Sequence, residues 1–110
     1  RRAGTVEPMA TERKQNGPAL GIFDSAAFPT SRASFDSGDC VVLFTDGIFE
    51  VYSPEGKEFG KEALVSTFHR HASLPADQMF IAVLDDVRAF ASRKEFDDDV
   101  CLVAVERARE

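Results

Sequence analysis

Two short apolar runs, each beside a cluster of acidic residues, constrain the fold of this chain more than any other feature. The first run covers residues 40–44 and stops at Thr45-Asp46-Gly47, and the second covers residues 100–105 and follows the three aspartates of 97–99. Such runs, bounded by turn-forming residues, are typical of strands that are buried on both faces. If the two strands are antiparallel neighbours, the end of one and the start of the other share one edge of the sheet. The sequence therefore predicts that the two acidic clusters meet.

The other segments favour an α+β fold with antiparallel pairing. Residues 48–52 form another apolar run and are a candidate strand, while segments 5–9 and 28–35 have weaker strand character. Apolar spacing predicts one helix over about 61–71 and a clearer one over 79–91, with Ser73 or Asp77 as its N-cap. The order β-β-α-α-β, with consecutive helices, is unlike that of alternating βαβ units.

Size and charge narrow the class of protein. With 110 residues the chain is one domain at most, and its start at Arg1 suggests that it was cut from a longer protein. Its net charge of −6 disfavours nucleic acid and anionic membrane surfaces as partners. No apolar run approaches the roughly 20 residues that span a bilayer, so a soluble cytoplasmic protein is the default expectation.

The cysteines and histidines do not suggest a site of their own. Cys40 and Cys101 match no zinc-binding spacing, and both are expected to be buried, reduced thiols. His69 and His71 are two positions apart on a predicted helix, so they do not share a face and are expected at the surface. Asp85 and Asp86 are expected on the solvated face of the second helix.

The acidic edge predicts a hard-metal site. Two like charges about 4 Å apart repel by roughly 4 kcal/mol at an effective dielectric constant near 20, so either a proton or a cation must offset them. Oxygen ligands without clustered His or Cys suit Mg²⁺ or Mn²⁺, and pairs of such ions activate water for phosphoryl hydrolysis. Gly47 would allow a tight turn beside the ion, and Glu50 is close enough in sequence to support a ligand. An ordinary Thr-Asp-Gly turn and a solvated Asp loop are the alternative interpretation.

The motifs resemble those of a known family. Residues 37–50, Ser-Gly-Asp-Cys-Val-Val-Leu-Phe-Thr-Asp-Gly-Ile-Phe-Glu, are similar to the "GD-x-hydrophobic-TDG-hydrophobic-x-E" block of bacterial metal-dependent serine/threonine phosphatases. The resemblance is to the protein phosphatase 2C-like superfamily, in its branch of stage II sporulation protein E and sigma-factor regulators. Residues 56–60 resemble its "G-x-x-FG", residues 98–105 its closing "DD-hydrophobic-T-L-hydrophobic" strand, and residues 17–21 its "G-x-PLG". Cys101 stands where that strand usually has Thr.

This resemblance implies part of an αββα sandwich with antiparallel sheets that binds two Mn²⁺ or Mg²⁺ ions at the sheet edge. Asp46 and Asp98 would be metal ligands, with Asp99 the alternative to Asp98, and Gly47 and Glu50 would assist. The implied activity is direct hydrolysis of phosphoserine or phosphothreonine in a protein substrate, of the anti-anti-sigma type, in bacterial signalling.

One departure limits these expectations. A further metal-binding Asp and a "GH" block belong to the first half of the family's domain and have no counterpart here. Residues 1–110 are therefore expected to be the C-terminal portion of a phosphatase domain, inactive alone and able to self-associate through exposed apolar surface. Two other functions stay open: a non-catalytic partner-binding module with a degenerate phosphatase fold, and a domain that Mg²⁺ or Ca²⁺ only stabilises.

Overall fold

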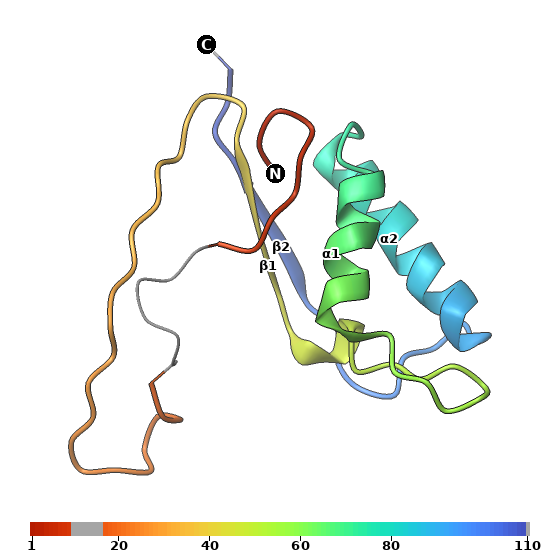
Figure 1. Cartoon of the computed structure of the whole chain (residues 1–110), viewed down its shortest axis with the longest axis horizontal. Coiled ribbons are helices and arrows are strands. Elements are labelled where there is room, and N and C mark those ends of the chain that lie inside the picture. The colour runs from red at the N-terminus through yellow and green to blue at the C-terminus, as the bar shows by residue number, and fades with distance from the viewer. Residues whose placement is uncertain (10–16, 110) are drawn as a thin grey trace.

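The chain folds as one helical layer on one small sheet (Figure 1). The computed structural model describes residues 1–9 and 17–109. Its elements, in chain order, are β1 (Cys40–Phe44), the 3₁₀ helix η1 (Asp46–Ile48), α1 (Gly60–Arg70), α2 (Ala76–Ala91) and β2 (Leu102–Glu106). The predicted α+β class is confirmed, and a helical layer on an antiparallel sheet is what part of an αββα sandwich would contribute.

The sheet pairs the two strands that the sequence predicts to be neighbours. β1 and β2 are antiparallel, and their register runs from Cys40 opposite Glu106 to Phe44 opposite Leu102. β2 begins two residues later than expected, so Val100 and Cys101 belong to its approach rather than to the strand. The end of β1 and the start of β2 therefore lie at the same edge of the sheet.

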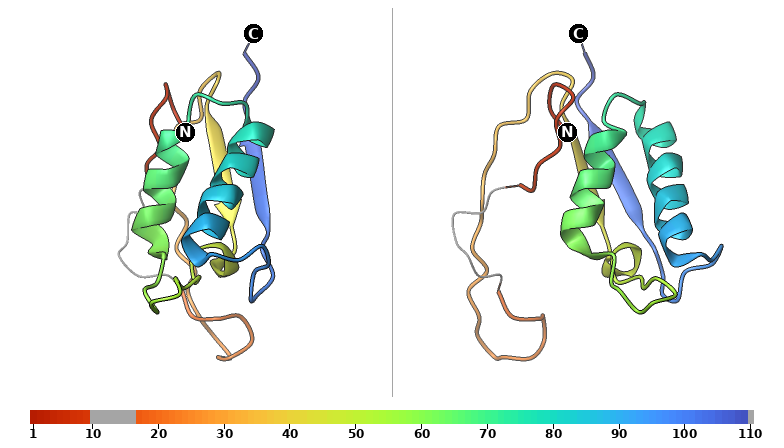
Figure 2. Two further views of the ribbon diagram at one scale, coloured as in Figure 1. Left: turned by 90° about the vertical axis from the view of Figure 1, so that its right-hand side faces the viewer. Right: turned by 45° about the vertical axis from the view of Figure 1, so that its right-hand side comes forward.

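The core lies between the sheet and the two helices, which cover one of its faces (Figure 2). Leu64 and Phe68 from α1 meet Met79, Val83 and Val87 from α2, and all five are buried. Within each helix these positions recur every four residues, a spacing that places side chains on one helical face. No helix in the described ranges 1–9 and 17–109 is long and apolar enough to cross a membrane.

The other face of the sheet is open, so the prediction of strands buried on both faces is wrong. Leu43 and Val103 lie opposite each other and are 58% and 46% exposed, and Val105 is 48% exposed. Their side chains alternate with those directed at the helices, because successive residues of a strand point to opposite faces. Self-association through this apolar face stays a prediction.

Three further predicted strands are wrong. Of segment 5–9, only Thr5 makes an isolated bridge, with Arg2, and the described residues 28–35 form no strand. The third segment, 48–52, also forms no strand: its first residue, Ile48, ends η1, and its last residue, Tyr52, makes an isolated bridge with Glu58. Residues 17–38 instead run as an arm beside the body of the molecule (Figure 1). The arm explains why the radius of gyration is 15.9 Å, above the roughly 13 Å of a compact chain of this length.

Several local expectations are also corrected. α2 begins after Pro75 and has no side-chain cap in the part of the chain that the structure describes, so neither Ser73 nor Asp77 is its N-cap. Cys40 is buried as expected, whereas Cys101 is exposed. His71 is only partly exposed, because its Nε2 lies 2.7 Å from Oδ2 of Asp86 and connects α1 to α2. Asp86 is therefore a contact between helices rather than part of a solvated face.

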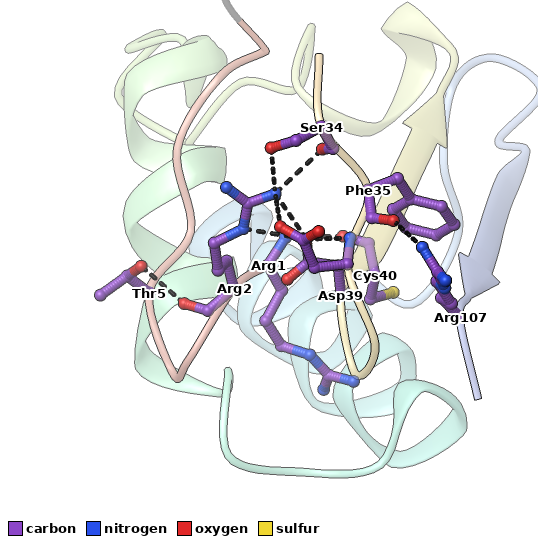
Figure 3. Close-up of polar contacts among 9 residues, drawn as sticks. Arg1, Arg2, Thr5, Ser34, Phe35, Asp39, Cys40 and Arg107 are labelled. Carbon is purple, nitrogen blue, oxygen red and sulfur yellow. Dashed lines mark hydrogen bonds and ion pairs between the residues drawn. The ribbon is translucent and has the colours of Figure 1, made fainter. Parts of the chain in front are cut away.

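The turn that leads into β1 is held by a buried carboxylate (Figure 3). Asp39 is 6% exposed and accepts hydrogen bonds from Nε and Nη2 of Arg2, at 2.9 and 2.5 Å. It also accepts the backbone N–H of Asp36 at 2.9 Å. These bonds, led by those from Arg2, lower the pKa of Asp39 and favour its charged form. The network joins the N-terminal segment to the start of β1.

The lowered pKa of Asp39 makes the stability of the chain sensitive to acid. The ionised Asp39 should make its full contribution to the free energy of unfolding above about pH 4, the ordinary pKa of Asp in an unfolded chain. This contribution should be lost as the pH falls through the lower pKa of the folded state. Urea denaturation at a series of pH values should show this loss, and Asp39→Asn should remove that part of the pH dependence. Asp36→Asn is the control, because Asp36 is exposed and lies 3.5 Å from the same Arg2. An equally steep acid dependence in Asp39→Asn would contradict the assignment.

Candidate functional site

The two acidic motifs meet at the edge where β1 ends and β2 begins. Asp46-Gly47 follows β1 by one residue, and Asp98-Asp99 lies shortly before β2. Their backbones are in contact, because a Cβ added at Gly47 would lie only 2.3 Å from the carbonyl oxygen of Asp99. Gly47 does not adopt a left-handed conformation, so close approach of the two chain segments is what requires glycine here. The sequence predicts a tight turn at Gly47, and the structure supplies a different reason for that residue.

A short helix fixes the position of Asp46. The carbonyl of Asp46 accepts hydrogen bonds from the N–H groups of Phe49 and Glu50, at 3.1 and 2.9 Å. Ile48 is fully buried in the core and anchors η1, while the side chain of Asp46 stays exposed. Glu50 is exposed and lies one turn from Asp46, as its sequence spacing indicates. The chain therefore presents a solvent-accessible carboxylate on a backbone that these two hydrogen bonds hold.

Thr45 connects the two motifs and was missed by the sequence reasoning. Its N–H donates to the carbonyl of Cys101 at 3.1 Å, and its hydroxyl accepts the N–H of Cys101 at 3.0 Å. The hydroxyl also donates to the carbonyl of Asp99, in a long contact of 3.4 Å. A Thr immediately before Asp-Gly is the only sequence signal for this role, and it does not reveal which segment the hydroxyl contacts.

The structure separates the three consecutive aspartates. Asp97 forms a bidentate ion pair with Arg93, with N–O distances of 2.9 and 2.6 Å, and this pair raises the pKa of Arg93. Asp98 accepts the backbone N–H of Asp99 at 2.8 Å through Oδ1, and both carboxylates are exposed. Because Arg93 offsets the charge of Asp97, the carboxylates left for another cation in this run are those of Asp98 and Asp99.

The donor chemistry of this edge fits a hard cation. Asp46, Asp98 and Asp99 offer carboxylate oxygens, which Mg²⁺ and Mn²⁺ prefer, and they are exposed to solvent. No group of three or more His, Cys, Asp or Glu side chains among the described residues is arranged to hold a metal ion. The described residues thus bring the backbones of the two predicted ligand motifs into contact without forming a complete ligand set among themselves.

Comparisons with known proteins agree with the motifs. The family model for stage II sporulation protein E matches residues 4–108. Protein IcfG of Synechocystis sp. (strain ATCC 27184 / PCC 6803 / Kazusa) is 27% identical over 94 residues, which cover 86% of this chain. The chain spans 15% of the length of that relative. No solved structure gives a significant match. Because the family model covers nearly the whole chain, the chain belongs to the stage II sporulation protein E family, within the protein phosphatase 2C-like phosphatases.

Proposed function

We propose that the parent protein of this chain removes phosphate from phosphoserine or phosphothreonine in a protein substrate, with Mn²⁺ or Mg²⁺ as its cofactor. The observation that carries the proposal is the contact between Gly47 and the backbone of Asp99, which brings together two acidic motifs that are far apart in the sequence. Membership of a phosphatase family agrees with it. A phosphorylated protein of the anti-anti-sigma type, in a bacterial signalling cascade, is the proposed substrate by likeness to that family.

In this proposal Asp46 and Asp98 hold the metal, and Asp99 is the alternative to Asp98. The ions would supply positive charge for the phosphate and a nucleophile derived from water. The chain's own contribution is to expose these carboxylates to solvent on two segments whose backbones are in contact. Further ligands would come from the rest of the parent protein, since the described residues offer no group of three.

The test is phosphatase activity of the full-length parent with and without Mn²⁺. Asp46→Asn and Asp98→Asn should each lower kcat/KM at least about a hundredfold, because metal stabilisation of phosphoryl transfer is worth several kcal/mol and each 1.36 kcal/mol changes a rate tenfold. Asp97→Asn is the matched control, because Asp97 belongs to the same run but pairs with Arg93 at the surface. It should leave activity nearly unchanged.

Two results would refute the proposal. One is activity that does not depend on a divalent metal, and the other is full activity in both Asp46→Asn and Asp98→Asn. A parent protein that binds its partner but releases no phosphate under any metal condition would favour the non-catalytic binding module instead.

A further inference from the structure

Thr45 lies where the two acidic motifs meet, and its side chain does not cap the helix that follows it. Thr45 occupies the N-cap position of η1 with an extended backbone, φ −92° and ψ 163°. Threonine in that position normally bonds a free N–H of the helix that follows. In the part of the chain that the structure describes, its side chain makes no such cap. The hydroxyl bonds the 99–101 segment instead, so the local preference is overridden by a contact across the sheet edge.

The contacts of Thr45 connect the two candidate ligand motifs directly. Three hydrogen bonds link this one residue to Asp99 and Cys101, and two of them use the hydroxyl. Asp46 is the next residue after Thr45, and Asp98 is the residue before Asp99. The hydroxyl can serve both bonds at once, since it donates one proton and accepts another. Thr45 therefore links the two backbone segments that carry the exposed carboxylates of Asp46 and Asp98.

We propose that Thr45 is a positioning residue, whose hydroxyl sets the spacing between Asp46 and Asp98 and thereby the affinity for the divalent ion. The proposal rests on the proposed function, because it takes these two carboxylates as ligands. Groups that orient metal ligands without touching the metal typically change affinity or activity by 10- to 100-fold when they are removed. Thr45 should act in this range.

The variants Thr45→Val and Thr45→Ser separate the hydroxyl from the shape of the side chain. Valine keeps the β-branched shape and suits the extended backbone but cannot make either hydroxyl bond, whereas serine keeps the hydroxyl. In the full-length parent, Thr45→Val should weaken Mn²⁺ binding about 10- to 100-fold by isothermal titration calorimetry, and Thr45→Ser should restore most of the affinity. Thr5→Val is the control, since the Thr5 hydroxyl bonds only the nearby carbonyl of Arg2 among the contacts of the described residues.

A second measurement does not need the metal. In the metal-free protein, the amide of Cys101 should exchange hydrogen faster in Thr45→Val than in the unaltered chain, because the hydroxyl is its acceptor. Either unchanged Mn²⁺ affinity or unchanged exchange in Thr45→Val would overturn the proposal. A Thr45→Val protein that does not fold would also overturn it, because Thr45 would then support the whole fold. If Asp46→Asn abolishes activity while Thr45→Val binds Mn²⁺ normally, only the role of Thr45 is refuted. If Asp46→Asn and Asp98→Asn retain full activity, the proposed function itself fails.

Discussion

Gly47→Ala should destabilise the chain by about 3 kcal/mol, at the upper end of what overpacking costs, and should separate the two acidic motifs. The added methyl group would lie 2.3 Å from the carbonyl oxygen of Asp99 and 3.1 Å from its carbonyl carbon. Both are backbone atoms, so no rotation of a side chain relieves the clash and one chain segment must move. Urea denaturation followed by circular dichroism measures the loss in the free energy of unfolding.

Gly17→Ala is the matched control for this substitution. Gly17 also lacks a left-handed backbone. A methyl group there would lie 2.6 Å from the ring of Phe28, and its nearest backbone contact, the carbonyl oxygen of Ala27, would be at 3.3 Å rather than 2.3 Å. That ring is 51% exposed and can rotate away, so the change should stay within about 0.5 kcal/mol. A Gly47→Ala chain as stable as Gly17→Ala would show that the backbones of residues 47 and 99 are not in contact.

Ile48→Ala should cost about 2–5 kcal/mol, the usual range for emptying a buried aliphatic site. Ile48 is fully buried and joins the core formed by both helices, and it lies two residues from Asp46. The cavity should therefore lower the stability of the fold and loosen η1 together. Thermal and urea denaturation measure the first effect, and hydrogen exchange of the Phe49 and Glu50 amides, which bond the carbonyl of Asp46, measures the second.

Ile81→Ala makes the same chemical change on the solvent side of α2. Ile81 is 61% exposed, and alanine is the best helix former, so this variant should change stability by no more than about 0.5 kcal/mol. Equal losses from Ile48→Ala and Ile81→Ala would mean that Ile48 does not anchor the core. A large loss from Ile48→Ala with unchanged exchange at residues 49 and 50 would mean that η1 does not depend on it.

The parts of the fold that could be predicted are those governed by local pattern. The helical spacing of Leu64 and Phe68, and of Met79, Val83 and Val87, predicted both helices, because a one-sided apolar face has few other ways to be buried. The apolar run at 40–44 predicted β1, and the polarity of antiparallel strands predicted that Asp46 and the 97–99 run would share an edge. These inferences need only the period of each element and the direction of the chain.

The predictions that were wrong concern how deeply strands and side chains are buried and which segments pair in the sheet. An apolar run indicates what a strand could bury, but the degree of burial depends on what covers each face, and the helices cover only one. For the same reason Cys101 is exposed although it follows the pattern of a buried thiol. Segment 48–52 has the composition of a strand, yet it begins at the last residue of η1, where Ile48 is buried in the core.

The sequence by itself determined three features: the opposed acidic motifs, the two helices and the family motifs. Each of them follows from residue type and spacing. Only the tertiary structure decided how the motifs join. It pairs Asp97 with Arg93, places Gly47 against the carbonyl of Asp99, and directs the hydroxyl of Thr45 across to Cys101. These contacts join residues up to 56 positions apart, and a hydrogen bond at that separation depends on distances of a few ångströms that no local pattern encodes.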